Sequence, residues 1–289
     1  MKYLLIPLMC ILATSKVLLQ SHYSKSKTFR ACDSVLYNCI MFTASALFLT
    51  PSLFLRGVSI YTWCFGIIAG ALSVGFQLAY MHAFSRGKPV LVTTINNFSM
   101  FIPIAASCIF LDESFGMPRA IALVLATVSL ILIASKDKNA DSKKTRSNSW
   151  ILFTVVAFLC NGFISTNQKV YANKSTGFDV FSFVSITYIT ASLLLFITMV
   201  IIRRRSLSAI VINKTTLLSA GGAGVFLGAF QCVSTYAASL IDGVILYSVY
   251  NVATNVLFAF IRVLFFAEKL SKKQIIGVCI AICSVLFMN

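Results

Sequence analysis

Long apolar segments separated by short polar stretches form the main pattern of this chain. A helix needs about 20 apolar residues to cross a lipid bilayer. Ten segments reach or approach that length, at about 3–20, 34–55, 60–84, 89–111, 117–135, 150–171, 179–202, 217–240, 243–267 and 272–288. They are apolar throughout rather than alternating, which excludes a transmembrane β-barrel. The pattern predicts an all-α membrane protein with ten transmembrane helices.

The pattern occurs twice along the chain. Three residues recur 154 positions later, where Gly70, Phe76 and Gln77 become Gly224, Phe230 and Gln231. Four more recur 155 positions later, where Asn96, Glu113, Ala126 and Ser129 become Asn251, Glu268, Ala281 and Ser284. Polar groups are unfavourable in lipid, so repeated amides in apolar helices indicate a retained role.

Weaker matches extend the repeat to the N-terminus. Lys16-Val17 recurs as Lys169-Val170, and Thr43-Ala44-Ser45 recurs as Thr190-Ala191-Ser192. The sequence therefore predicts a first unit at 1–135, a basic linker at 136–149 and a second unit at 150–289. Each unit holds five helices, and because five is odd, the second unit enters the membrane from the opposite side. We expect two inverted five-helix repeats, the arrangement of many secondary transporters.

Composition agrees with a membrane protein. The 289 residues are 58% hydrophobic and 11% charged, whereas about a quarter of the residues of a soluble domain are charged. The first segment permits a second interpretation, because Lys2 followed by LLIPLMCILATS also resembles a secretory signal. Cleavage there would remove the repeat partner of helix six.

The net charge of +16 is concentrated on one side of the predicted membrane. The loops that follow the odd-numbered helices hold 17 of the 24 lysines and arginines, and the opposite side holds four. The positive-inside rule then places both termini outside the cytoplasm, most simply in the plasma membrane. The reverse orientation stays open because insertion of the first helix can override loop charge. The spread of these residues over loops excludes a nucleic-acid partner.

Cysteine and histidine do not indicate a metal site or a disulfide framework. The nine cysteines are an odd number, most lie inside apolar segments, and no Cys-x-x-Cys occurs. Cys279 and Cys283 are one helical turn apart, but they lack a third ligand. With only His22 and His82 besides, we expect no metal and no cofactor.

Polar stripes on apolar helices are the candidate solute-binding residues. On helix nine, Tyr247, Asn251 and Asn255 follow one another at steps of four and share one face. Asn96 and Asn97 lie on helix four, and helices three and eight contribute the matched amides Gln77 and Gln231. Two interpretations stay open, because such groups either bind a solute between the units or join helices by hydrogen bonds of about 0.6 kcal/mol each.

Three cations lie inside the predicted helices. Lys16 and Lys169 are repeat counterparts, and Arg262 lies on helix nine. Either these side chains reach the membrane surface along their own length, or the inverted lysines attract an anionic or zwitterionic solute at opposite mouths. None of the eight carboxylates lies at mid-membrane, which disfavours a buried proton relay and favours facilitated diffusion or exchange.

Glycine and proline positions suggest how the helices pack. Gly66 and Gly70 on helix three, and Gly224 and Gly228 on helix eight, have the spacing that permits close approach of two helices. Pro103 in helix four predicts a kink just beyond the candidate amides. Its repeat counterpart is Phe258, so the two units differ at that point.

The chain resembles the drug/metabolite transporter superfamily, in the EamA-like group of ten-helix carriers. The doubled five-helix unit carries this resemblance, together with an acidic residue closing helices four and nine in FLDESFGMPRAIALVLATVSLILIA and FFAEKLSKKQIIGVCIAICSVLFM. A tyrosine-alanine stretch ends helices three and eight, at Tyr80–Ala83 and Tyr236-Ala237. The resemblance implies an EamA-like repeat at each unit, a central site between the halves, and metabolite cargoes such as amino acids.

Two features depart from that family. A tryptophan-glycine pair is common in its first helix, where this chain has Ala13-Thr14-Ser15. Its basic loops usually follow helices two and six, whereas here they follow the odd helices. This member is therefore expected to have the opposite orientation, and the direction of transport does not follow from the family.

The sequence predicts a secondary transporter, a facilitator or exchanger that moves a small polar solute by alternating access. A flippase for a lipid or lipid-linked sugar is the alternative on the same fold, and it would need a site open sideways to lipid. An intramembrane enzyme is disfavoured because no catalytic residues can be named. We expect a small-molecule solute and the lipid bilayer as partners, and a monomer or homodimer.

Overall fold

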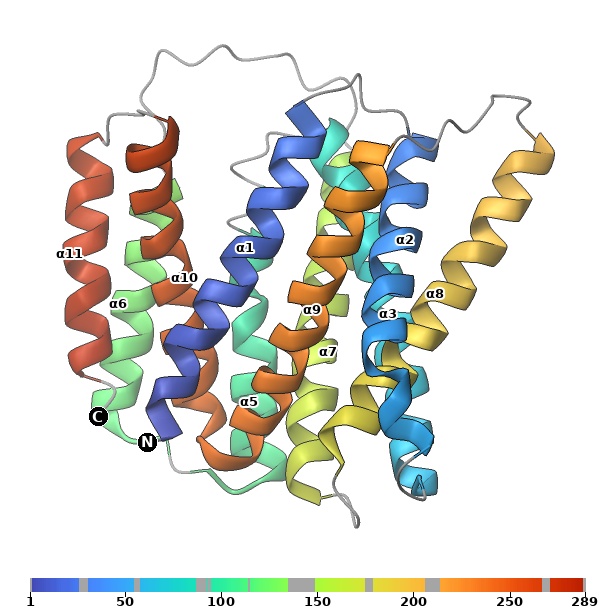
Figure 1. Cartoon of the computed structure of the whole chain (residues 1–289). Coiled ribbons are helices and arrows are strands. Elements are labelled where there is room, and N and C mark those ends of the chain that lie inside the picture. The colour runs from blue at the N-terminus through green and yellow to red at the C-terminus, as the bar shows by residue number, and fades with distance from the viewer. Residues whose placement is uncertain are drawn as a thin grey trace.

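The computed structural model describes residues 2–25, 31–54, 58–86, 92, 95–113, 115–134, 149–174, 179–205, 214–266 and 271–287. Within these ranges the chain forms helices and no strand (Figure 1). The long helices are α1 Leu5–Lys25, α2 Ala31–Leu49, α3 Ile60–Arg86, α5 Phe101–Phe110, α6 Met117–Ala134, α7 Ser149–Lys174, α8 Val180–Arg205, α9 Lys214–Leu240, α10 Gly243–Phe266 and α11 Lys272–Leu286. Short 3-10 helices are η1 Lys2–Leu4, η2 Thr50–Phe54 and η3 Phe98–Met100.

Ten helical segments of the described chain occupy the ten predicted spans, which confirms an all-α membrane protein. Five of them are long and apolar enough to cross a bilayer, and four shorter apolar helices accompany them. Leucine, isoleucine and phenylalanine side chains are exposed on their outer faces, among them Leu47, Ile68, Phe196 and Leu218. Such faces are compatible with lipid and not with water, so the protein is an integral, multi-pass membrane protein.

The fourth span is interrupted. Its backbone is helical at residues 95–97, passes through η3 and continues as α5. Pro103 is the third residue of α5, where its ring lacks an N–H and crowds the carbonyl of Ser99, four residues earlier. This explains why the turn at η3 is tighter than an α-helix. The predicted break lies where proline requires it, and α10 continues as a regular helix at the corresponding place.

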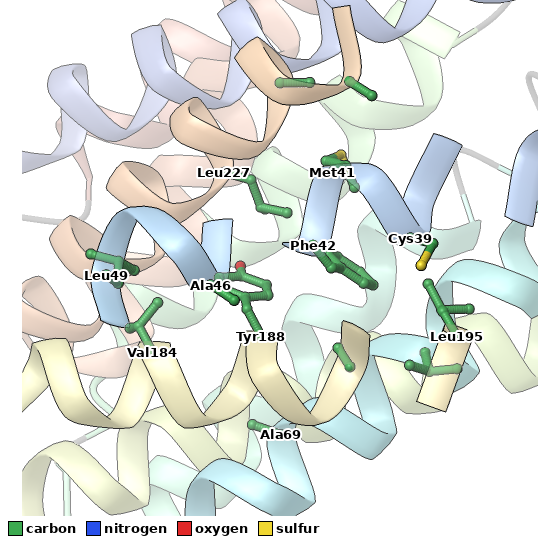
Figure 2. Packing of buried hydrophobic residues seen from close by; sticks show 14 of the residues in the cluster. Cys39, Met41, Phe42, Ala46, Leu49, Ala69, Val184, Tyr188, Leu195 and Leu227 are labelled. Atoms are coloured by element: carbon green, nitrogen blue, oxygen red, sulfur yellow. The ribbon is translucent and has the colours of Figure 1, made fainter. Parts of the chain in front are cut away.

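Two clusters of buried side chains hold the bundle together. The first gathers α2, α3, α8 and α9, and Figure 2 shows Phe42 of α2 beside Tyr188 of α8, with ring centroids 5.5 Å apart. The second joins α1, α5, α6, α10 and α11 through residues such as Met9 and Leu246. Helix contacts run α1 with α9, α3 with α7, α2 with α9 and α3 with α8. Segments far apart in the sequence therefore form one bundle.

Glycine permits the closest of these contacts. A methyl group added at Gly70 would lie 2.6 Å from the carbonyl oxygen of Thr187 on α8. One added at Gly224 would overlap the carbonyl oxygen of Met41 and lie 2.8 Å from the Cβ of Ala44, both on α2. The glycines predicted to permit close helix approach therefore lie between α3 and α8 and between α9 and α2.

We expect Gly70→Ala and Gly224→Ala each to lower the thermal stability of the purified protein, because forced overpacking costs about 1–3 kcal/mol. Gly221→Ala is the matched control, since an added methyl there meets nothing within 4 Å and alanine favours a helix by roughly 1 kcal/mol. Thermal unfolding in detergent, read by size-exclusion chromatography, measures the difference. Equal melting temperatures for all three variants would contradict this packing.

Candidate functional site

The amides predicted on helices four and nine meet inside the bundle. The Nδ2 of Asn97, beside the break in the fourth span, donates to the Oδ1 of Asn255 on α10 over 3.2 Å. The Nδ2 of Asn255 also donates to the backbone carbonyl of Asn251, at 2.7 Å. Asn251 repeats this contact with Tyr247 at 2.8 Å. A polar stripe on α10 therefore faces the fourth span, away from lipid.

Asn96 is not satisfied in the same way. Its Oδ1 is buried and accepts no hydrogen bond within the described chain. A buried carbonyl oxygen without a donor costs about 1–3 kcal/mol, and the hydroxyls of Ser107, Thr216 and Ser248 are buried without a partner as well. The neighbouring Asn97, in contrast, is held by Asn255.

Further polar contacts fix α7 against this region. The hydroxyl of Tyr247 donates to the carbonyl of Ser165 on α7 at 2.8 Å, and the Nδ2 of Asn161 donates to the Ser99 hydroxyl at 2.6 Å. Ser99 lies in η3, so the interrupted turn is anchored by a side chain of the other half. The sequence analysis missed Asn161 and Ser165, which have no counterpart in the repeat.

The matched glutamines have different surroundings. The Nε2 of Gln77 on α3 donates to the Oδ1 of Asn38 on α2 at 2.7 Å, and both side chains are buried. Gln231 is buried on α9, where its backbone carbonyl accepts from the Thr235 hydroxyl. For Gln77 the contact is the interhelical bond of the simpler interpretation, so the repeat of sequence is not a repeat of hydrogen bonds.

A buried ion pair lies at one end of the bundle. The Nζ of Lys169 on α7 is 2.8 Å from the Oε1 of Glu113, with side chains 4% and 11% exposed. The same ammonium donates to the carbonyls of Ala238 at 3.0 Å and Ile241 at 2.7 Å, at the end of α9. The Oε2 of Glu113 accepts the backbone N–H of Gly243, the first residue of α10, at 2.7 Å. We call Lys169, Glu113 and Gly243 the turn clamp.

The turn clamp matches the charges of the two helix ends. The last carbonyls of a helix carry partial negative charge and the first N–H groups partial positive charge, and both lack partners within the helix. Lys169 binds the carbonyl end of α9, and Glu113 binds the N–H end of α10. The two-residue connection between these helices is thereby tied to α7 and to the turn after α5.

The local backbone at Glu113 explains how this carboxylate reaches its partners. Asp112 has φ of 51°, in the left-handed region that aspartate tolerates better than most residues. The N–H of Glu113 donates to the carbonyl of Ser107 at 3.4 Å, and this hydrogen bond holds the turn against the end of α5. At Gly243, an added methyl would overlap the Ser107 hydroxyl. Only glycine permits α10 to begin so close to α5.

A second ion pair at the same end is exposed. The Nη2 of Arg119 on α6 is 2.9 Å from the Oδ2 of Asp242, and their side chains are 22% and 49% exposed. Its N–O distance of 2.9 Å is close to the 2.8 Å of the pair between Lys169 and Glu113. Exposed pairs contribute about 0–1 kcal/mol, so exposure rather than length separates the two.

The ammonium of Lys169 is buried in the turn clamp, where Glu113 pairs with its charge within the protein. The sequence analysis treated Lys169 and Glu113 separately. Both residues are repeated in the other half, as Lys16 and Glu268, and this shared repetition is the feature that could have suggested their pairing. The side chain of Arg262 lies outside the described residues.

Lys16, the repeat counterpart of Lys169, has a different environment. It lies on α1, whose apolar span Lys2–Leu19 agrees with the predicted span, although the helix itself continues to Lys25. Lys16 is therefore nine residues from the helix end, about 13 Å along the axis. Its side chain is surrounded by protein and partly exposed, and among the described residues it makes no hydrogen bond or ion pair.

Comparison with known proteins gives a family and a fold. Residues 148–289 match the model of the EamA-like transporter family. A crystal structure of another protein superposes with a TM-score of 0.74 over 97% of this chain and 96% of that chain, at 12% sequence identity. At that identity the likeness shows the fold alone. No curated protein matches the sequence.

We expect Lys169→Met and Glu113→Gln each to destabilise the protein, since removing one partner of a buried pair costs about 3–5 kcal/mol. The double variant should lose less than the sum, because the partners are coupled. Arg119→Gln, the exposed control, should change the free energy of unfolding by less than about 1 kcal/mol. Thermal unfolding in detergent tests all four, and an Arg119 effect as large as that of Lys169 would refute the assignment.

Proposed function

We propose that this chain is a secondary transporter, a facilitator or exchanger of a small polar solute, because its residues 148–289 match the model of the EamA-like transporter family. The hydrogen bond between Asn97 and Asn255 carries this proposal. It joins the interrupted fourth span to α10 through amides that face protein rather than lipid. Polar groups that face one another between helices, away from lipid, are where a transporter is expected to bind its solute.

We further propose that the halves are inverted repeats, at 1–135 and 150–289, joined by the linker 136–149. The helix contacts support a twofold repeat, because exchanging the halves maps each of these contacts onto another. The odd number of helices proposed for each unit is what makes the repeat inverted. The contact of α3 with α7 corresponds to that of α9 with α1, and α3 with α8 corresponds to α9 with α2. Gly70 against α8 and Gly224 against α2 follow the same exchange.

Inverted halves allow alternating access, in which one end of the bundle closes while the other opens. The turn clamp ties α7 to the turns α5–α6 and α9–α10, so it closes the end at which α1 begins (Figure 1). Opening this end requires Glu113 to separate from Lys169 or from Gly243. In this mechanism Lys169 holds one end of the bundle closed. The solute is bound by four asparagines, Asn96, Asn97, Asn251 and Asn255.

Coupling to a buried carboxylate is disfavoured. The carboxylates with described side chains lie at the end of the turn clamp, at Asp112, Glu113, Asp179 and Asp242. Proton-coupled carriers usually keep an ionisable acid deep in the bundle. Facilitated diffusion or exchange needs no such residue. We propose the plasma membrane as the site of action.

Replacing Asn96 and Asn251 together by leucine is expected to abolish transport and preserve the fold, because both amides face the proposed pathway and leucine suits an apolar helix. Cells with the wild-type chain, the double variant or no chain are compared by untargeted mass spectrometry of small metabolites. Thr198→Leu is the control, since that hydroxyl bonds only to its own helix. Wild-type changes that persist in the double variant would remove the amides from the solute site.

Orientation is tested by cysteine labelling. A cysteine at Ser142, in the basic linker outside the described residues, is expected to react with an impermeant maleimide only after permeabilisation, because loop charge places that linker in the cytoplasm. A cysteine at Phe115, exposed in the turn between α5 and α6, should react on intact cells. The parent chain, with its native cysteines, gives the background. The reverse result would invert the topology.

A further inference from the structure

The repeated lysines differ in their charge partners. Lys169 has the carboxylate of Glu113 at 2.8 Å and two backbone carbonyls. Lys16 makes no ion pair or hydrogen bond among the described residues, although protein surrounds it. The same position of the repeat thus holds one compensated cation and one uncompensated cation.

Lys16 faces the bundle rather than lipid. Leu8 and Ile11 form the exposed face of α1, with 42% and 57% of their surface accessible. Met9, seven residues before Lys16 and therefore on nearly the same face, is 1% exposed and packs in the second core cluster. This position argues against a lysine that simply snorkels along lipid to the surface.

Distance separates Lys16 from the described carboxylates. Ile6 packs with Ala238 and Ile241 at the end of the turn clamp. Lys16 is ten residues farther along α1, about 15 Å at 1.5 Å per residue. The acids at Asp112, Glu113, Asp179 and Asp242 belong to the other end, so none of them neutralises it.

The amides of the candidate site lie beside the same helix. The Sγ of Cys10 on α1 is 3.5 Å from the Oγ1 of Thr254 on α10. Thr254 adjoins Asn255, which bonds to Asn97, the neighbour of Asn96. Lys16 is six residues beyond Cys10, about 9 Å along the axis. The cation lies on α1 and the amide acceptor without a donor on the fourth span, and α10 contacts both of these elements.

We propose, resting on the transport function above, that the solute carries an acidic group, a carboxylate or a phosphate, and that Lys16 binds it. An ammonium surrounded by protein is unfavourable without an anion, and Lys16 keeps accessible surface that a solute can reach. The free Oδ1 of Asn96 accepts a hydrogen bond from an N–H or O–H of the same solute. Lys169 takes no part in binding because Glu113 neutralises it.

Stability without solute gives the first test. Lys16→Met removes an uncompensated charge, so its melting temperature is expected to equal or exceed that of the wild type, whereas Lys169→Met lowers it. Glu268, the repeat counterpart of Glu113, lies outside the described residues and is the acid that symmetry offers to Lys16. Glu268→Gln should therefore leave stability unchanged. Equal losses for Lys16→Met and Glu268→Gln would overturn the proposal.

Transport gives the second test. Full-length protein is reconstituted in vesicles loaded with a small-molecule extract of the expressing cells, and mass spectrometry identifies what leaves. Every released compound is expected to carry a carboxylate or phosphate, and its identity distinguishes the two. Lys16→Met should slow release at least about tenfold, Lys16→Arg should retain part of it, and Lys272→Met, at an exposed lysine, should change nothing.

The outcomes separate the two proposals. Release of a neutral or cationic compound, at equal rates from wild type and Lys16→Met, would confirm a transporter and refute the acidic solute. No release from wild-type vesicles would refute transport itself. The stability comparison stands in either case, because it requires no solute.

Discussion

Every polar group inside this bundle must find its partner within the protein, because the bilayer core contains no water to supply one. Three solutions appear. Hydroxyls such as Thr43 and Thr198 donate to the carbonyl four residues earlier on their own helix. Amides pair across helices, as Gln77 does with Asn38. The buried cation Lys169 combines a carboxylate with two helix-end carbonyls. The Oδ1 of Asn96 and the ammonium of Lys16 have none of these partners among the described residues, and they are therefore the candidates for solute binding.

The turn clamp shows how the constraint shapes the bundle. Both ends of a membrane helix leave backbone groups without partners, and a two-residue connection gives little chain to cover them. Lys169 and Glu113 cover the end of α9 and the start of α10 with charges of the sign that each helix dipole attracts. The arrangement also links four helices at one end. The contacts that satisfy these backbone groups therefore also hold α7, α9, α10 and the turn after α5 together.

Sequence patterns were sufficient for the helices, because these follow from local periodicity. They also selected Asn97 and Asn255, but not the contact between them, which depends on how the two helices pack. They were insufficient for the pair Lys169–Glu113, since that contact depends on how two turns and α7 come together. The first span was also predicted closely, since the apolar span of the structure is Lys2–Leu19, although α1 itself continues to Lys25. The sequence could not show that Lys16 makes no ion pair with the other described residues, because that depends on how the helices pack.

A carrier of this kind needs two states of similar free energy, and a solute shifts them only by binding one better than the other. The difference between the two lysines supplies such a term. In the proposed mechanism the compensated Lys169 favours closure at its end, and the uncompensated Lys16 is neutralised when an anion binds. An acidic solute would then stabilise the protein by an amount that a neutral solute lacks. We therefore propose charge compensation at Lys16 as the source of selectivity.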